Sequence, residues 1–138
     1  MQTFLNDTDK DILVSPDADF SALSADDFDA LVILGGTVNA DNLRVNETAI
    51  FLAKGFAQSG KPVAAICHEP WLLVEADLLP GKTLTSYHTV RTDILNAGGE
   101  WVDESVVKSK ENGWTLITSR NPGDLDAFSK AITEELEA

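Results

Sequence analysis

Two short, uninterrupted apolar runs constrain the fold of this chain more than any other feature. The first covers residues 30–34 and is followed directly by Gly35 and Gly36, and the second covers residues 63–66. Continuous rather than alternating apolarity is typical of strands that are covered on both faces, as in a parallel sheet. The sequence therefore predicts an α/β architecture in which helices cover a mostly parallel sheet.

Helix signals lie between and after these runs. Asn46 is a good N-cap and Glu47 suits the positive end of a helix, so we predict a helix over residues 47–58 that ends before Gly60 and Pro62. The pattern also predicts helices at residues 70–76 and 89–97 and from about residue 124 to the end. Further strands are predicted at residues 83–85, 106–107 and 115–118.

The chain of 138 residues is long enough for one core and too short for two. We expect a single domain in which residues 30–138 form the core. Residues 1–29 are polar and acidic, and they predict a weakly structured segment or loop with room for one edge strand. Within this segment, residues 24–27 have the composition of a turn.

The formal net charge of −13 limits the classes of partner. An acidic surface without a basic patch repels phosphate backbones, so we expect no nucleic-acid binding. No apolar run approaches the ~20 residues of a membrane span, and the first seven residues do not resemble a signal peptide. The sequence therefore predicts a cytoplasmic protein with no membrane contact.

The chain contains one cysteine, Cys67, and two histidines, His68 and His88. A closed zinc site of Cys and His residues needs four ligands, so these three do not form one, and we expect no metal and no cofactor. A lone cysteine beside a histidine indicates either a nucleophile or a small buried thiol.

Cys67 and His68 stand where the second apolar run stops and a helix begins near Pro70. A sharp turn at this point lifts a nucleophile above the sheet, and the positive helix start favours a thiolate. Backbone N–H groups at such a turn can stabilise an oxyanion. Because the carboxyl ends of parallel strands lie at one edge, the N–H of Gly36 is expected to face Cys67.

A wider pattern places Gly-Gly before the Cys-His turn and Thr-Ser-Arg-Asn-Pro after it. It is carried by residues 29–36, 43–44, 61–71, 81–86, 96–104 and 118–122. This pattern resembles the PfpI family of intracellular cysteine peptidases, protein deglycases and glyoxalases, within the class I glutamine amidotransferase-like superfamily. The resemblance covers nearly everything from residue 12 onward. It implies a flavodoxin-like three-layer sandwich and assembly as dimers or hexamers.

The resemblance also implies roles for individual residues. Cys67 would be the nucleophile, His68 its partner, and the N–H groups of Gly36 and His68 the oxyanion hole. Asp41 matches a carboxylate that reaches the histidine from a neighbouring subunit in the family. A loop or helix-capping role is the alternative for Asp41.

Four further residues are pocket candidates: Gly35, Glu69, His88 and Arg120. Glu69 stands where the family commonly has a small residue, and a carboxylate there would raise the pKa of the thiol and narrow the pocket. His88 is also interpreted as an ordinary surface residue. Arg120 would either orient a substrate or hold loop carbonyls.

The sequence has no counterpart of the family's opening strand-helix-strand, which carries a buried glutamate that supports the cysteine. Two functions therefore remain open. One is a cofactor-independent cysteine hydrolase or deglycase that acts on peptide or glyoxal-derived carbonyls. The other is a non-catalytic redox or stress protein, or an inactive truncated homologue, whose Cys67 is oxidisable. The missing segment further predicts either a homo-oligomer that covers the exposed sheet or a shortened form of a longer protein.

Overall fold

The computed structural model describes residues 1–6 and 8–138. Its centre is a four-stranded sheet in the order β3-β4-β8-β7. The strands are β3 (Leu31–Ile33), β4 (Val63–Ile66), β8 (Leu116–Ser119) and β7 (Val107–Ser109). The first three run parallel, and β7 lies antiparallel to β8. This arrangement confirms the mostly parallel sheet and the two buried apolar strands at its core.

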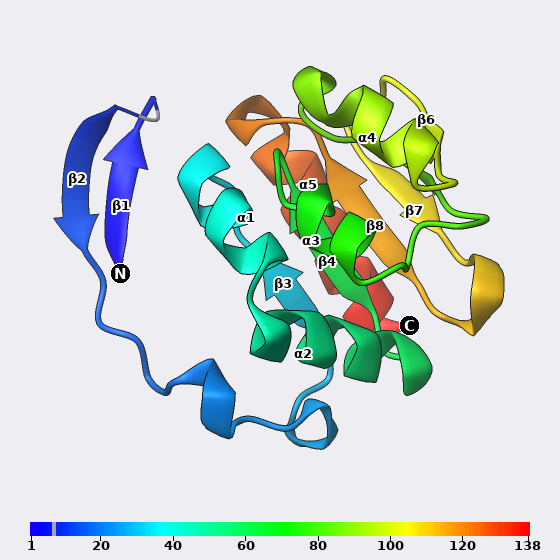
Figure 1. Cartoon of the computed structure of the whole chain (residues 1–138), viewed down its shortest axis with the longest axis horizontal. Helices are drawn as coiled ribbons and strands as arrows, with labels where there is room; N and C mark the ends of the chain where they lie inside the picture. Colours follow the sequence, from blue (N-terminus) through cyan, green and yellow to red (C-terminus); the bar gives the residue numbers. More distant parts are fainter. Residues whose placement is uncertain (7) are drawn as a thin grey trace.

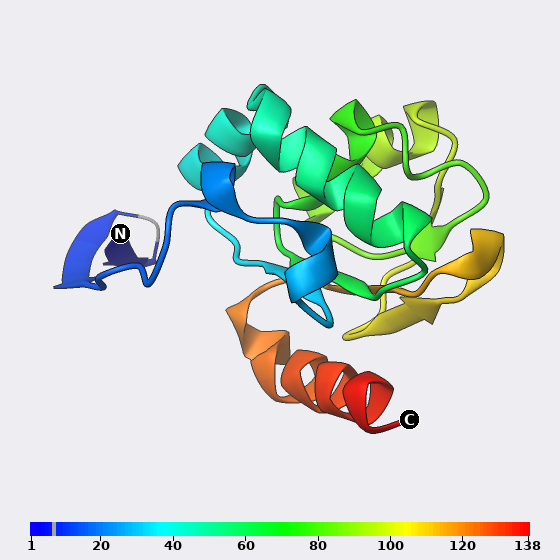
Figure 2. The ribbon, with the colours of Figure 1, turned by 90° about the horizontal axis from the view of Figure 1, so that it is seen from below.

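Helices cover the sheet from both sides (Figures 1 and 2). The helices α1 (Thr37–Arg44), α2 (Glu47–Gln58), α3 (Pro70–Glu75) and α4 (Arg91–Asn96) lie on one face. The single helix α5 (Leu125–Glu137) covers the other face, as Figure 2 shows. The molecule is therefore the predicted three-layer α/β sandwich, and no helix of the described residues is long and apolar enough to cross a membrane.

Strand β4 divides the hydrophobic core into two clusters, because successive side chains of a strand point to opposite faces. Val63 and Ala65 pack into the larger cluster beneath α2, α3 and α4. Ala64 and Ile66 pack into the smaller cluster beneath α5, which includes Phe128. Both faces of β4 are closed to water, which explains its unbroken apolar sequence.

The local signals set the ends of the predicted elements. The Asn46 side chain accepts the N–H of Ala49 at 3.0 Å, and α2 spans Glu47–Gln58 as the cap predicted. Gly60 adopts a left-handed φ of +71° after it. Pro70 occupies the first turn of α3. Helix α4 is shorter than the predicted 89–97 because a 3₁₀ turn, His88–Val90, replaces its first turn.

Three features differ from the sequence-based expectation, namely the structure of residues 1–29, the presence of α1 and a further short strand. Residues 1–29 contain two strands, β1 (Gln2–Leu5) and β2 (Asp9–Leu13), which form an antiparallel hairpin. The strand content was underestimated because β2 is exposed along its whole length and carries no buried-strand pattern. Helix α1 was not predicted, since its sequence has few apolar residues and Gly36 gives it no side-chain cap. Strand β6 (Glu100–Trp101) pairs in parallel with β5 (Thr83–Leu84), and its two residues are too few to show a period.

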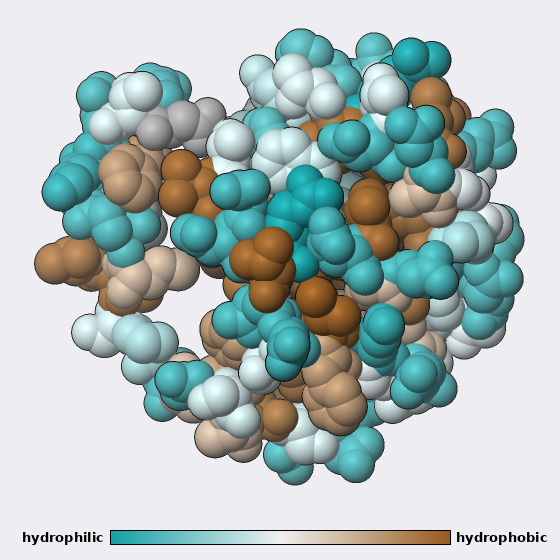
Figure 3. All heavy atoms as spheres, viewed as in Figure 1, coloured by the Kyte–Doolittle hydropathy of each residue, from teal (hydrophilic) through white to brown (hydrophobic). Residues whose placement is uncertain are grey.

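The edge strand β3 exposes apolar side chains. Val32 is 41% exposed and Leu34, just beyond the strand, is 55% exposed. Ile33, which points to the opposite face, is buried under the helical layer. The hairpin β1–β2 also exposes apolar residues, and Figure 3 shows them as brown spheres beside the main body.

Candidate active site at a cysteine elbow

Cys67 occupies a strained turn between β4 and α3. Its φ is +68°, a left-handed value that residues other than glycine rarely adopt. Two backbone hydrogen bonds hold this conformation, because the Cys67 N–H donates to the Ser119 carbonyl at 3.0 Å and the Tyr87 N–H donates to the Cys67 carbonyl at 2.8 Å. The half-buried thiol is therefore fixed at the carboxyl edge of the sheet, as the sequence predicted for an elbow.

The His68 ring lies against the thiol. Its Nδ1 is 3.1 Å from the Cys67 Sγ and 3.5 Å from the Thr37 Oγ1, and its Nε2 is 3.4 Å from the Thr89 Oγ1. When Nε2 carries the proton and donates it to Thr89, Nδ1 is left as the acceptor for the thiol proton. This geometry brings a thiol and a base within reach of each other.

Aromatic side chains enclose the His68 ring. Tyr87 stacks on it with the ring centroids 4.7 Å apart, and Trp71 meets it edge-on at 5.3 Å. The indole N–H of Trp71 donates to Asp93 at 2.8 Å, which fixes that wall. His68 is buried as a result and is not an ordinary surface histidine.

The Gly35–Gly36 loop approaches the elbow closely. A Cβ on Gly35 would lie 3.1 Å from the Cβ of Cys67 and 3.4 Å from the Ile66 carbonyl oxygen. Gly36 has a φ of +114° and starts α1, where its carbonyl accepts the N–H of Ala40 at 2.9 Å. The parallel strand ends therefore bring Gly35 next to Cys67, whereas the oxyanion role of the Gly36 N–H stays a prediction.

Glu69 is fully buried at 0% exposure, which is uncommon for a charged residue type. Its Oε1 accepts a hydrogen bond from the Asn39 Nδ2 at 2.9 Å, whereas its Oε2 has no hydrogen bond within the part of the chain that the structure describes. Burial raises the pKa of Glu69 to about 8, and the Asn39 hydrogen bond opposes this rise. Glu69 is therefore mostly neutral at pH 7.

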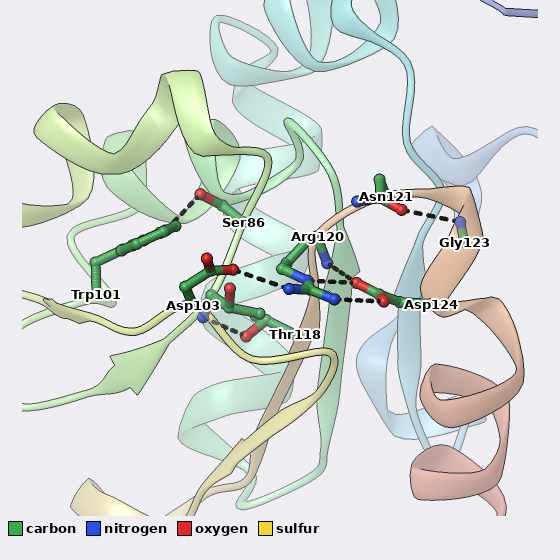
Figure 4. Close-up of polar contacts among 9 residues, drawn as sticks. Ser86, Trp101, Asp103, Thr118, Arg120, Asn121, Gly123 and Asp124 are labelled. Carbon is green, nitrogen blue, oxygen red and sulfur yellow. Dashed lines mark hydrogen bonds and ion pairs between the residues drawn. The ribbon is translucent and has the colours of Figure 1, made fainter.

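His88 and Arg120 line a shallow hollow of about 190 Å³ beside Tyr87. Arg120 is held by Asp124 through two bonds, Nε–Oδ2 at 2.9 Å and Nη2–Oδ1 at 3.0 Å, and by Asp103 at 2.9 Å (Figure 4). These carboxylates raise the pKa of Arg120, with Asp124 as the main cause. Arg120 therefore holds the loop after β8, and it faces the hollow with its charge already compensated.

Asp41 lies on the exposed side of α1. The role assigned to it requires a neighbouring subunit, so that role stays a prediction. A larger hollow of about 320 Å³ lies between residues 23–26 and α2, and none of its lining residues belongs to the elbow. Among the described residues, no cluster of three or more His, Cys, Asp or Glu side chains is placed to hold a metal ion.

Sequence reasoning missed four residues of the site. Thr37 and Thr89 contact the two nitrogens of His68, Tyr87 stacks on its ring, and Asn39 binds Glu69. Each stands one to three residues from a residue that the sequence analysis did single out. Proximity to Gly36 or His88 was the only signal that pointed to them.

Comparisons with known proteins show relatives over most of the chain. The model of the DJ-1/PfpI family matches residues 6–135. Deglycase PfpI of Pyrococcus furiosus is 41% identical over 124 residues, which are 90% of this chain and 72% of the relative. The putative cysteine protease YraA of Bacillus subtilis is 44% identical over 117 residues, which are 85% of this chain and 66% of the relative.

The fold likewise matches solved structures. The crystal structure of DJ-1beta from Drosophila melanogaster aligns with a TM-score of 0.81 and 32% identity. That alignment covers 91% of this chain and 66% of DJ-1beta. The chain thus spans about two thirds to three quarters of the length of the proteins named above.

Proposed function

We propose that this chain, which belongs to the DJ-1/PfpI family, acts as a cysteine hydrolase or deglycase whose nucleophile is Cys67 and whose base is His68. Relatives named as a deglycase and a putative cysteine protease support this class of reaction. The substrate would be a small carbonyl compound or a peptide, and no cofactor takes part.

The 3.1 Å contact between the Cys67 Sγ and the His68 Nδ1 carries the proposal. A thiol becomes a strong nucleophile only as a thiolate, so an adjacent base is the group that it needs. The left-handed turn at Cys67 supports the same role, because strained backbone conformations cluster at active sites, where the surrounding structure enforces them.

The proposed first step is attack of the Cys67 thiolate on the substrate carbonyl. Sγ–H gives its proton to Nδ1, and the thiolate forms a C–S bond to the substrate carbonyl carbon. The carbonyl electron pair moves to oxygen, near the N–H groups of Gly36 and His68, and the imidazolium then returns the proton. With a peptide, this proton goes to the leaving amine as the C–N bond breaks, and water then hydrolyses the acyl thioester. With a glyoxal, the proton goes to the oxyanion and gives a hemithioacetal, which an internal hydride shift converts to a thioester that water hydrolyses.

The test is consumption of methylglyoxal, and release of the free amine from a glycated amine, by the wild type and by Cys67→Ser. We expect activity in the wild type and a loss of at least a hundredfold in the variant. Thr92→Ser, an exposed position on α4, is the control and should keep full activity. An inactive wild type under conditions where it is folded would refute the proposal.

The proposal extends to a homo-oligomer in which Asp41 of a second copy reaches the His68 site. Asp41 is exposed on α1, and α1 begins directly after the Gly35–Gly36 loop. We expect Asp41→Asn to lower turnover several-fold and to leave the folding stability unchanged. Equal turnover in Asp41→Asn and the wild type would assign Asp41 to the surface.

The second candidate is a non-catalytic redox or stress protein. It is favoured by the single, half-buried thiol beside an imidazole, which is the environment of an oxidisable cysteine. Mass spectrometry after mild peroxide treatment would show one added oxygen on Cys67 that thiol reductant removes. A thiol that stays unoxidised would eliminate this candidate.

A further inference from the structure

Glu69 is a buried acid that neither proposed reaction uses, and its contacts join two separate parts of the site. It sits on the elbow between His68 and Pro70, and its Oε1 accepts the Asn39 Nδ2 at 2.9 Å. The same Nδ2 donates to the Leu34 carbonyl at 3.0 Å. Because an amide nitrogen has two hydrogens, both bonds form together, and they tie the end of β3 and the first turn of α1 to the elbow.

These two hydrogen bonds of Asn39 restrain the Gly35–Gly36 loop. That loop lies between Leu34 and Asn39 in the chain, and a Cβ on Gly35 would lie only 3.1 Å from the Cβ of Cys67. Fixing Leu34 and Asn39 therefore fixes the loop from both ends. The Glu69–Asn39 hydrogen bond therefore links the elbow to this loop in addition to the pairing of β3 with β4.

The two oxygens of Glu69 differ in a way that identifies the proton-bearing atom. Oε1 accepts a hydrogen bond, as a carbonyl oxygen does, and Oε2 is buried without a partner among the described residues. A negative charge on an unsolvated oxygen is far more costly than a hydroxyl group at the same place. The arrangement therefore fits a neutral carboxylic acid with its proton on Oε2.

The charged groups on the neighbouring elements do not compensate a carboxylate at Glu69. On α1 and α3, Arg44 pairs with Glu75 at 2.8 Å, and on α4, Asp93 accepts the Trp71 indole. No ion pair reaches Glu69 within residues 1–6 and 8–138. The remaining ionisable side chains on these elements, on the elbow and on α2 are Asp41, Glu47, Lys54, Cys67, His68 and Arg91, and Arg91 lies over the Trp101 ring.

We propose that Glu69 is a positioning residue that works in its neutral form: through Asn39 it clamps the Gly35–Gly36 loop and the first turn of α1 onto the Cys67 elbow, and loss of its proton releases them. Its consequence for catalysis rests on the proposed function of Cys67. The clamp itself is a property of the fold and is measured without any substrate.

Linkage gives the pH dependence of the clamp. In the open state Glu69 is solvated and titrates near the ordinary value of 4.5, whereas burial raises its pKa in the closed state to about 8. The equilibrium for opening therefore rises by about tenfold per pH unit between these values and becomes constant above the higher one. The site is held most firmly at the acidic end of this range.

Hydrogen exchange of the full chain tests this. The protection factors of α1 amides are compared with those of α5, which lies on the other face of the sheet, at several pH values between 5 and 9. We expect the α1 protection relative to α5 to fall steeply up to about pH 8 and then level off. In Glu69→Gln, which keeps a neutral acceptor for Asn39, the relative protection should not change with pH.

The clamp would be overturned if the protection of α1 relative to α5 did not change with pH in the wild type, or if it fell equally steeply with pH in Glu69→Gln. It would also be overturned if the Glu69 carboxyl carbon, followed by ¹³C NMR, titrated near the ordinary pKa of a glutamate. Asn39→Ala should lower α1 protection, while Asn42→Ala on the same helix should not. Absence of activity in the wild type as well as in the variants would count against the proposed function alone, since exchange and titration do not depend on it.

Discussion

At the scale of single residues, the most informative position is Cys67, whose side chain and backbone conformation are in conflict. A left-handed φ at a residue other than glycine costs of order 1 kcal/mol or more. The Ser119 carbonyl and the Tyr87 N–H hold the residue there. The cysteine at this turn therefore costs conformational free energy that a glycine would not cost.

This conflict predicts the effect of glycine at the elbow. Cys67→Gly should be more stable than Cys67→Ala by about 1 kcal/mol, because glycine adopts positive φ without strain. The matched control is Ala65→Gly on β4, where the backbone is ordinary and glycine should destabilise by at least about 1 kcal/mol. Urea unfolding of the three variants measures both differences. A less stable Cys67→Gly would mean that the turn is not strained.

The residues of the site were predictable where the chain itself supplies the signal. Cys67, His68 and Gly35 follow the ends of apolar strands, and parallel strand ends meet at one edge of a sheet. The burial of Glu69 was not predictable, because charged residues usually stay in water. It depends on Asn39, thirty residues away, in a helix that the sequence pattern did not reveal.

At the scale of elements, the loop between β8 and α5 depends on one buried carboxylate. Asp124 is only 7% exposed, binds the Arg120 guanidinium through two oxygens and also accepts the Arg120 backbone N–H at 3.1 Å. Asp103, the second partner of Arg120, is 68% exposed. A buried two-point ion pair fixes a loop far better than a solvated single contact.

The two carboxylates should therefore differ in energetic weight. We expect Asp124→Asn to lower the free energy of unfolding by about 1–3 kcal/mol, and Asp103→Asn by less than about 1 kcal/mol. The Arg120 hydrogen bonds lower the pKa of Asp124 in the folded protein below its ordinary value of 3.8. The stability that ionised Asp124 contributes is therefore complete above pH 3.8, and it is lost as the pH falls through the pKa of the folded state. Urea unfolding at pH 7 and pH 3 should show the penalty of Asp124→Asn shrinking in acid. Equal penalties for the two variants at pH 7 would contradict this ranking.

Helices with a start signal and a stop signal in the sequence were predicted with correct bounds. Helix α2 has the Asn46 cap before it and Gly60 after it, so its bounds were given correctly. Helix α1 begins at Gly36 without a side-chain cap and carries one buried residue, Ala40, so it depends on packing against α3. Tertiary contacts of this kind leave no periodic signal in the sequence.

At the scale of the whole molecule, the fold has one well-covered and one partly covered face. Helix α5 packs against β8 and β4, and Figure 2 shows it alone on that side of the sheet. Val32 and Leu34 of the edge strand region remain exposed. An unpaired parallel edge with apolar side chains favours pairing with another chain. The net charge of −13 opposes such pairing at low salt.

We therefore expect this chain to self-associate through the β3 edge, and more strongly when salt screens its charge. Sedimentation velocity over a wide concentration range should show dimers or larger species that become more populated from low to physiological ionic strength. Leu34→Lys should shift the population to monomer, because a charge on the edge cannot be buried without a partner. Phe51→Lys is the matched control, since Phe51 is a 75% exposed apolar residue that belongs to α2 and not to the sheet. A wild type that stays monomeric at all concentrations, or an equal effect of the two lysine variants, would exclude β3 as the interface.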